Sequence, residues 1–406
     1  MKTLFHMNFF ATKELMDPKK KRSALFCLPF VARRAKEGGK NQRLGLGQYM
    51  FAGCLLFSPA YAQTTTIAAT PAVGYSKLTA RGASDSFVSI PLVQRSALVA
   101  NISAVDHSAV TLSVAGLVDG VYAPGASAVY YLQFVSGNLS GLCYKILNNQ
   151  GYVFTLDTRG DDLTNHPLGA VNTGATGDLV RIRPYWTIGT IFGNAPSQIF
   201  LDPIATFNGP VYPGADEILL PDNTSTGTQK PPAAVYGYVT NSGWREHNDP
   251  NTDASATTFW PGVPFTIRRQ NPAPVDILVT GYVSADRLVQ SIPVVTAGAD
   301  FDQAVSLAYP LTISLASSGL FSVTTPIILP SVDSLHLGDL VLSYPDNRSG
   351  FSLPPDQRFY VVGTDWFETE APADQSLLQP EAGYILRLRG LHSANYWVQS
   401  PPLTPP

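Results

Sequence analysis

The stretch that decides the fold occupies residues 215–223 and reads ADEILLPDN, and a close copy, GDLVLSYPDN, occupies residues 338–347. In both stretches an aspartate precedes a short apolar run, and the residues Pro, Asp and Asn end it. This pattern is typical of a β-strand bounded by turn residues. Its repetition predicts two related β units within one chain.

The likeness continues downstream in the same order and at a nearly constant spacing. Asp216 and Asp339 are 123 residues apart, and Trp244 and Trp366 are 122 residues apart. Chance similarity does not keep the order and spacing of several motifs, so we expect the two tryptophans to be equivalent residues of a core or an interface. The other corresponding segments are Tyr238–Glu246 with Tyr360–Glu368 and Phe265–Arg269 with Tyr384–Arg389.

Upstream, the first unit is longer than the second. A weaker likeness pairs Gly74 and Tyr75 with Gly281 and Tyr282, at an offset of 207 residues. This larger offset predicts an insertion in the first unit, with its own rhythm of strands and Gly or Asn turns. The expected limits are a first β unit at 63–95 plus 181–272, an inserted small β domain at 96–180, a second β unit at 273–392 and a Pro-rich tail at 393–406.

Apolar and polar side chains alternate along most of the chain after residue 62, and no stretch of eleven or more residues keeps the spacing of an amphipathic helix. Gly and Pro are frequent, with 33 of each among 406 residues. The expected fold class is all-β, with two duplicated β-sandwich or barrel-like units and a small β-barrel-like domain inserted in the first. The expected strands are Phe87–Leu92, Val110–Val114, Val129–Val135, Tyr152–Leu156, Leu179–Arg183, Glu217–Leu220, Val235–Thr240, Phe265–Arg268, Asp276–Tyr282, Ser322–Leu329, Leu340–Tyr344, Phe359–Gly363 and Tyr384–Arg389.

The first 62 residues have the composition of a secretion signal with a long basic leader. An apolar run from Tyr49 to Phe57 follows the basic residues, and Ala60 and Ala62 supply the small residues that signal peptidase needs. The run is shorter than the ~20 residues of a membrane span. We therefore expect cleavage after Ala62 and export to the periplasm, the outer surface or the medium, and we do not expect a transmembrane protein.

Loss of this leader makes the chain acidic. It holds 11 of the 27 Lys and Arg residues and 3 of the 30 Asp and Glu residues, which leaves 16 basic and 27 acidic residues and a net charge of −11. A lysine-poor, acidic surface argues against nucleic acid as a partner. Cys143 alone remains after cleavage, so an internal disulfide is excluded, and its alternating surroundings predict a strand residue rather than a reactive thiol.

Several motifs stand in a fixed order along residues 72–392. They include DSFVSIPL at 85–92, GDDL at 160–163, PYWTIGTIF at 184–192, ADEIL at 215–219 and GWR at 243–245. This set resembles an uncharacterised family of secreted proteins that occurs as many paralogues in environmental bacteria of verrucomicrobial type. The resemblance implies secretion and a β-rich body, and it brings no catalytic residue, cofactor or substrate.

One turn has the beginning of a calcium loop. Asp249, Asn251 and Asp253 follow the D-x-N-x-D pattern in which alternate oxygen side chains converge on one hard cation. Ala254 stands where such a loop has glycine, and Trp260 stands where it has a bidentate glutamate. The alternatives are a calcium site and a solvated Asn-Asp-Pro turn, and no other cofactor is expected.

Enzyme motifs are absent from the sequence. It contains no metalloprotease helix motif, nucleophile elbow, P-loop or dinucleotide glycine pattern between a strand and a helix, and the histidines after residue 62 are far apart. We therefore expect a protein that is not an enzyme.

Two functions stay open at this point. The first, which we favour, is a structural or interaction protein of the bacterial cell exterior that contacts envelope components. The second is a carbohydrate-binding module for polysaccharide, because exposed aromatic faces stack on sugar rings. The aromatic candidates are Tyr185, Trp186, Trp260 and Trp397. An exposed row of them favours sugar binding, and burial of every tryptophan favours the scaffold.

Overall fold

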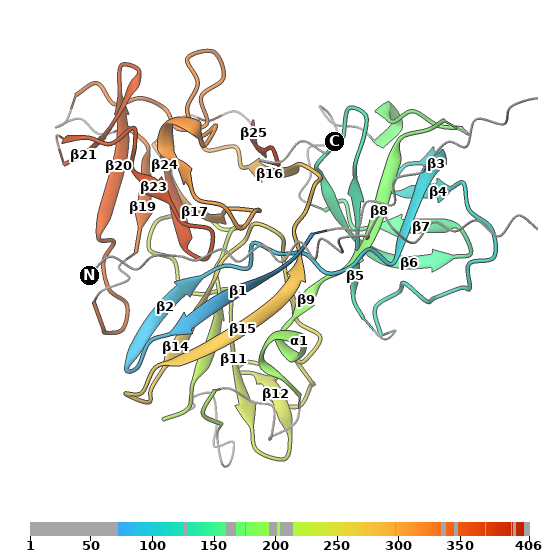
Figure 1. The fold of residues 1–406 in the computed structure, drawn as a ribbon, viewed down its shortest axis with the longest axis horizontal. Helices are drawn as coiled ribbons and strands as arrows, with labels where there is room; N and C mark the ends of the chain where they lie inside the picture. Colours follow the sequence, from blue (N-terminus) through green and yellow to red (C-terminus); the bar gives the residue numbers. More distant parts are fainter. Residues whose placement is uncertain are drawn as a thin grey trace, which may run out of the picture. The chain divides into compact units, whose positions relative to one another are not determined.

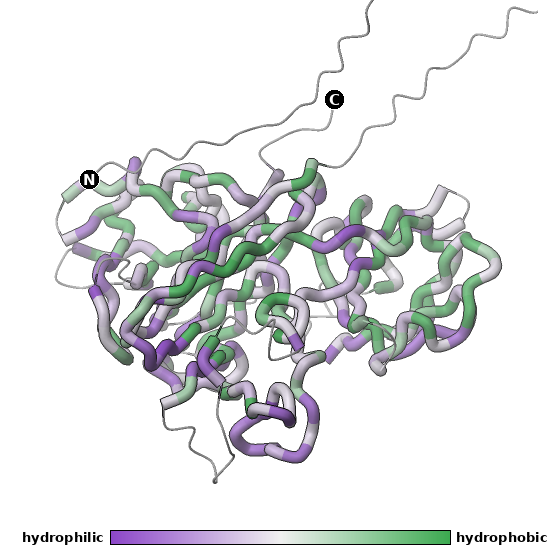
Figure 2. The backbone as a smooth tube through the Cα atoms, turned by 60° about the horizontal axis from the view of Figure 1, so that its bottom comes forward, coloured by the Kyte–Doolittle hydropathy of each residue, from purple (hydrophilic) through white to green (hydrophobic). Residues whose placement is uncertain are grey.

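A computed structural model describes residues 72–401, except 126–127, 160–167, 175, 195–200, 204–213, 297, 334–337, 345–347, 370, 391 and 393–394. Within these residues the expected all-β class is confirmed, because strands dominate and each helical element is only three to five residues long. Hydrophobic residues run along the strands, and hydrophilic residues gather in several of the turns (Figure 2). None of these helices is long and apolar enough to span a bilayer.

The first β body contains a five-stranded sheet in the order β12-β11-β10-β14-β2 and a two-stranded ribbon, β1-β15, whose strands lie side by side in Figure 1. The inward faces of sheet and ribbon share one core, in which Ile218, Ile267 and Ile277 are completely buried. Its elements are β1 (Val73–Ala80), β2 (Ser84–Val88), β9 (Trp186–Thr187), α1 (Ile188–Phe192), β10 (Glu217–Leu220), β11 (Ala234–Val239), β12 (Gly243–Glu246), β13 (Thr258–Phe259), β14 (Phe265–Arg269) and β15 (Val275–Tyr282).

The second β body contains a six-stranded sheet in the order β17-β24-β19-β20-β21-β22 and a separate pair, β16-β25. Val341, Trp366, Leu386 and Trp397 are buried in its core. Its elements are β16 (Leu288–Ile292), β17 (Asp300–Ser306), β18 (Ile313–Ser314), the 3-10 helix η3 (Leu315–Ser317), β19 (Leu340–Ser343), β20 (Gln357–Val362), β21 (Asp365–Glu368), β22 (Ala371–Pro372), β23 (Leu377–Leu378), β24 (Gly383–Arg389) and β25 (Asn395–Gln399).

Strand by strand, the two bodies have the same order. The series β2-β14-β10-β11-β12 of the first matches β17-β24-β19-β20-β21 of the second. Asp216 and Asp339 each accept a hydrogen bond from a backbone N–H. The carboxylate of Asp216 accepts the Gln270 N–H at 2.7 Å, and that of Asp339 accepts the Arg389 N–H at 2.6 Å. Descent of both bodies from one duplicated unit stays a prediction.

The inserted domain is a closed six-stranded barrel in the order β3-β4-β7-β6-β5-β8. Its chain leaves the first body after β2 and returns at β9, and it has a core of its own that includes Ile102, Leu132 and Phe154. Its elements are β3 (Leu98–Asp106), β4 (Ala109–Leu112), β5 (Tyr130–Phe134), β6 (Cys143–Gln150), β7 (Val153–Leu156), the 3-10 helix η1 (Leu168–Ala170) and β8 (Leu179–Pro184).

The strand pairing moves two of the expected limits and removes one expected strand. Gly74 lies directly opposite Gly281 in the β1-β15 ladder, and β15 packs into the core of the first body, so the first body extends to Tyr282. The expected tail contains β25, which pairs with β16 along its whole length. The expected strand Ser322–Leu329 is an irregular segment, in which Pro326 has no N–H to donate to a ladder.

Candidate functional site: two adjoining hollows around Trp260

Two adjoining hollows lie where the barrel meets the loop after β13 and the strand β16. The smaller has a volume of about 30 Å³ and the larger about 220 Å³. Both share a wall made of Cys143, Trp260, Pro261, Val263 and Leu288. Because these residues come from the barrel, the first body and the second body, the wall forms only when all three are folded.

Two arginines of β8 fix the barrel next to the smaller hollow. The Arg181 Nε and one Arg183 terminal nitrogen lie 2.8 Å and 3.1 Å from the same Asp286 carboxylate oxygen. Asp286 and Arg183 are both buried. A buried carboxylate between two guanidinium groups is stable only while the partners stay in place, so this cluster holds β8 against the segment after β15.

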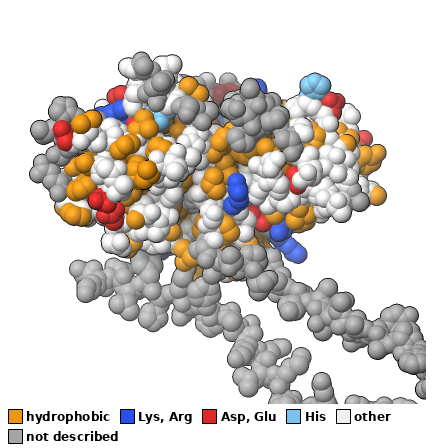
Figure 3. Space-filling model, turned by 90° about the horizontal axis from the view of Figure 1, so that it is seen from above, with side chains coloured by type: hydrophobic (Ala, Val, Ile, Leu, Met, Phe, Trp, Pro, Cys, Tyr) orange, Lys and Arg blue, Asp and Glu red, His pale blue; other side chains and the backbone are white. Residues whose placement is uncertain are grey.

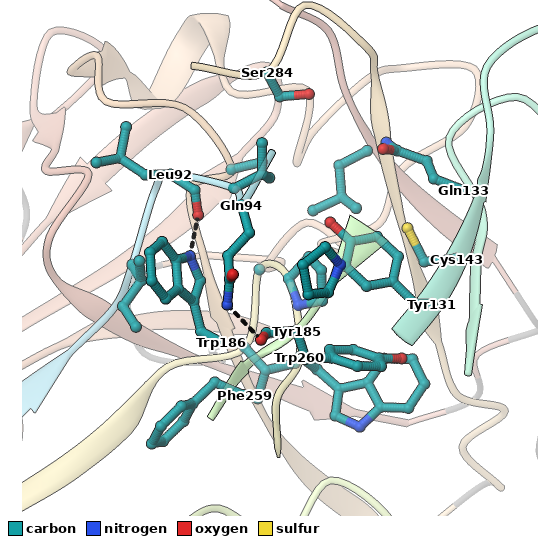
Figure 4. A pocket seen from close by; sticks show the side chains of 18 of the residues that line it. Leu92, Gln94, Tyr131, Gln133, Cys143, Tyr185, Trp186, Phe259, Trp260 and Ser284 are labelled. Carbon is teal, nitrogen blue, oxygen red and sulfur yellow. Dashed lines mark hydrogen bonds between the residues drawn. The ribbon is translucent and has the colours of Figure 1, made fainter. Parts of the chain in front are cut away.

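Short hydrogen bonds set the backbone at the junction of barrel and first body. The Gln94 side-chain amide donates to the Tyr185 carbonyl oxygen at 2.6 Å, and the Trp186 indole N–H donates to the Leu92 carbonyl oxygen at 2.8 Å (Figure 4). The chain segments that enter and leave the barrel are thereby tied together. Trp186 is held as part of this frame, with its N–H already used.

Trp260 is the aromatic residue of the shared wall, and 39% of its surface is accessible. Its ring meets the ring of Tyr185 edge to face, with the centroids 5.2 Å apart, and Tyr185 in turn packs against Tyr131 at 4.7 Å. Such aromatic contacts restrict the rotamers of the rings that make them. The indole is therefore held in one position, with part of its surface free for a ligand.

Several buried polar atoms of the lining have no hydrogen-bond partner among the described residues. They are the side-chain oxygens of Gln133 and Tyr185 at the smaller hollow and of Gln290 and Gln303 at the larger. The amide nitrogens are already engaged, with Gln133 donating to the Arg287 carbonyl, Gln290 to the Gly262 carbonyl and Gln303 to the Ser291 carbonyl. A buried acceptor without a donor costs about 1–3 kcal/mol, so water or a ligand hydroxyl is the expected partner.

The titratable groups of the lining are uncharged or neutralised at neutral pH. Burial raises the pKa of the Cys143 thiol to about 12, and it raises the pKa values of the Tyr131 and Tyr185 phenols well above their usual range. At the larger hollow, Asp157 forms an ion pair with Arg159, and the hydrogen bond from Arg159 lowers the pKa of that carboxyl group. The lining therefore offers neutral hydrogen-bonding groups and apolar surface, and its thiol is not nucleophilic.

The structure brings three of the four aromatic candidates together. Tyr185, Trp186 and Trp260 all line the smaller hollow. The expectation for Trp397 is wrong, because this side chain is completely buried in the second body and its indole N–H donates to the Ser318 carbonyl. Cys143 is the first residue of β6, as its sequence pattern predicts. The three glutamines of the lining have no sequence signal.

The calcium hypothesis gains no support from the turn that contains its residues. Asp253 accepts hydrogen bonds from the backbone and the hydroxyl of Ser255, at 3.1 Å and 2.7 Å, and it lies 3.5 Å from Arg245. Asp249 and Asn251 are exposed at the same turn. In the part of the chain that the structure describes, no three His, Cys, Asp or Glu residues are grouped to hold a metal ion. Calcium binding at Asp249, Asn251 and Asp253 stays a prediction.

Comparison of the chain with protein-family models, with curated proteins and with solved structures finds no match in any of the three.

Proposed function

We propose that the chain is an exported, non-enzymatic interaction protein of the bacterial cell exterior, with envelope components as its partners. The observation that carries the proposal is the lining around Trp260, which combines a fixed, partly exposed indole with uncharged hydrogen-bonding groups. Such a lining suits recognition by contact. The basic leader and the acidic composition of the remaining chain support export.

The acids and bases of the site are occupied in ways that favour contact over a chemical step. Asp286 is held by two arginines, and Asp157 is paired with Arg159. General acid or base catalysis needs a group that exchanges protons near the working pH, and the Cys143 thiol, with its pKa of about 12, stays protonated there.

The exposed surface also carries hydrophobic side chains that suit contact with another macromolecule. Among the coloured side chains on the face seen in Figure 3, hydrophobic ones are frequent and charged ones are few. On the β1-β15 ribbon, Val73, Tyr75 and Leu278 are each more than 60% exposed. Groups of this kind form contacts with other macromolecules at little cost of desolvation.

Carbohydrate binding is the second candidate function, and the exposure of Trp260 is the specific observation that favours it. Trp244, Trp366 and Trp397 are buried, and Trp186 is only partly exposed. The described tryptophans therefore form no exposed row, and the aromatic contact available to a sugar is a single indole.

Two measurements test the proposed function in the cells that make the protein. The full chain with a small C-terminal tag is followed by cell fractionation and N-terminal sequencing, and we expect a secreted or periplasmic form that begins at Gln63. A photoreactive benzoylphenylalanine at position 260 is expected to capture an envelope component, whereas the same group at the exposed Tyr152 of the barrel captures none. A cytoplasmic chain with its leader intact, or equal capture at both positions, overturns the proposal.

A further inference from the structure

We infer that the larger hollow beside Trp260 binds one ring of a neutral, hydroxyl-rich ligand, a single sugar residue. This inference rests on the proposed function and gives it a ligand class. It follows from four properties of the hollow: its size, its unpaired acceptors, its apolar wall and the geometry that fixes them.

The size of the hollow suits about one ring. Its volume of about 220 Å³ is below the ~300–1,000 Å³ of sites that hold drug-sized molecules. It is also several times the ~30 Å³ that one water molecule occupies in the liquid. The hollow has room for one sugar ring.

Two polar side chains of the lining lack a hydrogen-bond donor, which favours a ligand or water that donates hydrogen bonds. Gln290 and Gln303 each have a side-chain oxygen without a donor, and both side chains are more than 90% buried. Phosphate and carboxylate groups carry acceptors only and leave these oxygens unpaired. Sugar hydroxyl groups donate and accept. A cationic donor is disfavoured because the carboxylate at the rim, Asp157, is already neutralised by Arg159.

The shared wall is apolar on the side that a ring would face. Trp260, Pro261, Val263 and Leu288 line the larger hollow together. The C–H face of a sugar ring packs on such a surface, and its hydroxyl groups point outward from the ring edge toward polar partners. The lining of the larger hollow thus combines an apolar wall with two glutamines, the two kinds of surface that one sugar residue needs.

Gly262 fixes the side-chain amide of Gln290 beside the wall. Its backbone has a φ of +77°, a conformation that glycine adopts readily. Its carbonyl oxygen accepts the Gln290 side-chain N–H at 2.7 Å, and a Cβ at this position would overlap the same nitrogen atom. The absence of a side chain lets the loop close over Gln290, so the amide is oriented before a ligand arrives, which lowers the entropy cost of binding.

The test is saturation-transfer NMR of the full chain with methyl glycosides of glucose, galactose, mannose, xylose and N-acetylglucosamine. Glucuronate and tetramethylammonium serve as an acidic and a cationic probe. We expect transfer to at least one neutral glycoside. In Trp260→Ala the dissociation constant for that glycoside rises about tenfold or more, as expected for the loss of a stacked ring, and Trp260→Phe restores part of the affinity.

Matched variants separate binding from folding. Gln303→Leu removes the unpaired acceptor, together with the N–H that donates to the Ser291 carbonyl, at nearly constant volume and is expected to weaken binding. Tyr152→Ala removes an exposed aromatic ring of the barrel and leaves binding unchanged. Absence of transfer to every neutral glycoside overturns the inference, as does unchanged affinity in a folded Trp260→Ala variant or binding of only the acidic or cationic probe. If the chain is exported and position 260 captures an envelope component, but the glycoside-binding tests fail, the inference is wrong and the proposed function is retained.

Discussion

Replacement of Asp339 by asparagine removes the charge of a completely buried carboxylate while keeping its size. One carboxylate oxygen accepts the Arg389 N–H and the other accepts the Leu329 N–H, each at 2.6 Å. The His392 Nε2 lies 3.0 Å from the second oxygen. Asparagine offers one carbonyl oxygen and turns an NH₂ group toward the other donor, so one buried backbone N–H loses its acceptor.

The expected loss of stability follows from these contacts. A buried donor without an acceptor costs about 1–3 kcal/mol, and a hydrogen bond to a charged group contributes about 1.5–3 kcal/mol. These effects overlap, because they concern the same carboxylate. We expect the free energy of unfolding to fall by about 3–5 kcal/mol in Asp339→Asn.

Guanidinium chloride unfolding monitored by tryptophan fluorescence measures this change, because Trp366 and Trp397 belong to the same core. Asp365→Asn is the matched control, since Asp365 is exposed on β21 and its replacement is expected to change stability by less than ~0.5 kcal/mol. A free energy of unfolding for Asp339→Asn within ~1 kcal/mol of the unchanged protein would refute the reasoning.

Three further predictions follow from other buried contacts. Asp216→Asn is expected to destabilise the first body by a similar amount, about 3–5 kcal/mol, because Asp216 accepts two backbone N–H groups and pairs with Arg269. If only the Asp339 variant loses stability in the same unfolding experiment, this prediction is wrong. Cys143 should react about thirtyfold more slowly with a thiol reagent at pH 8 than after unfolding. Burial moves its pKa from 9.0 to about 12, and the greater nucleophilicity of the more basic thiolate offsets only part of the lost thiolate fraction. The rate is measured in a chain carrying C27S and C54S, and a fast reaction of the folded chain argues against the raised pKa. Gly383→Ala should lower the unfolding free energy by about 1–3 kcal/mol, since the new Cβ would lie 2.5 Å from the Phe87 ring of the other body. An unchanged denaturation midpoint would show that the two bodies do not pack this closely.

The sequence predicts strands whose two faces differ in polarity. β14 and β24 alternate between buried and less buried residues, so their period of two is visible. β17 is not predicted, because its segment DFDQAVS is polar although six of its seven residues are buried. Asp302 is tolerated there because the Arg387 guanidinium donates to both of its oxygens at 2.8 Å. A local pattern cannot show a partner that lies 85 residues away in the chain.

The aromatic part of the candidate site is predictable, and the polar part is not. Tyr185, Trp186 and Trp260 are notable in sequence because aromatic residues near turns are common in binding surfaces. Gln133, Gln290 and Gln303 lie on three strands of two different parts of the molecule, and an isolated glutamine has no spacing that marks it. The prediction for Trp397 failed because β25 continues into a Pro-rich segment that suggests a tail, whereas the strand pairs with β16 and is buried.

We expect Trp260 to mark a binding site for a neutral sugar residue in an exported interaction protein. Affinity electrophoresis of residues 63–406 through gels that contain branched neutral or acidic polysaccharides tests it most directly, with a chelator present so that the Asp249 turn binds no calcium. We expect a neutral polysaccharide to retard the unchanged chain and Tyr152→Ala, and not to retard Trp260→Ala. Equal mobility of all three proteins in every gel, or retardation by acidic polymers alone, would contradict it.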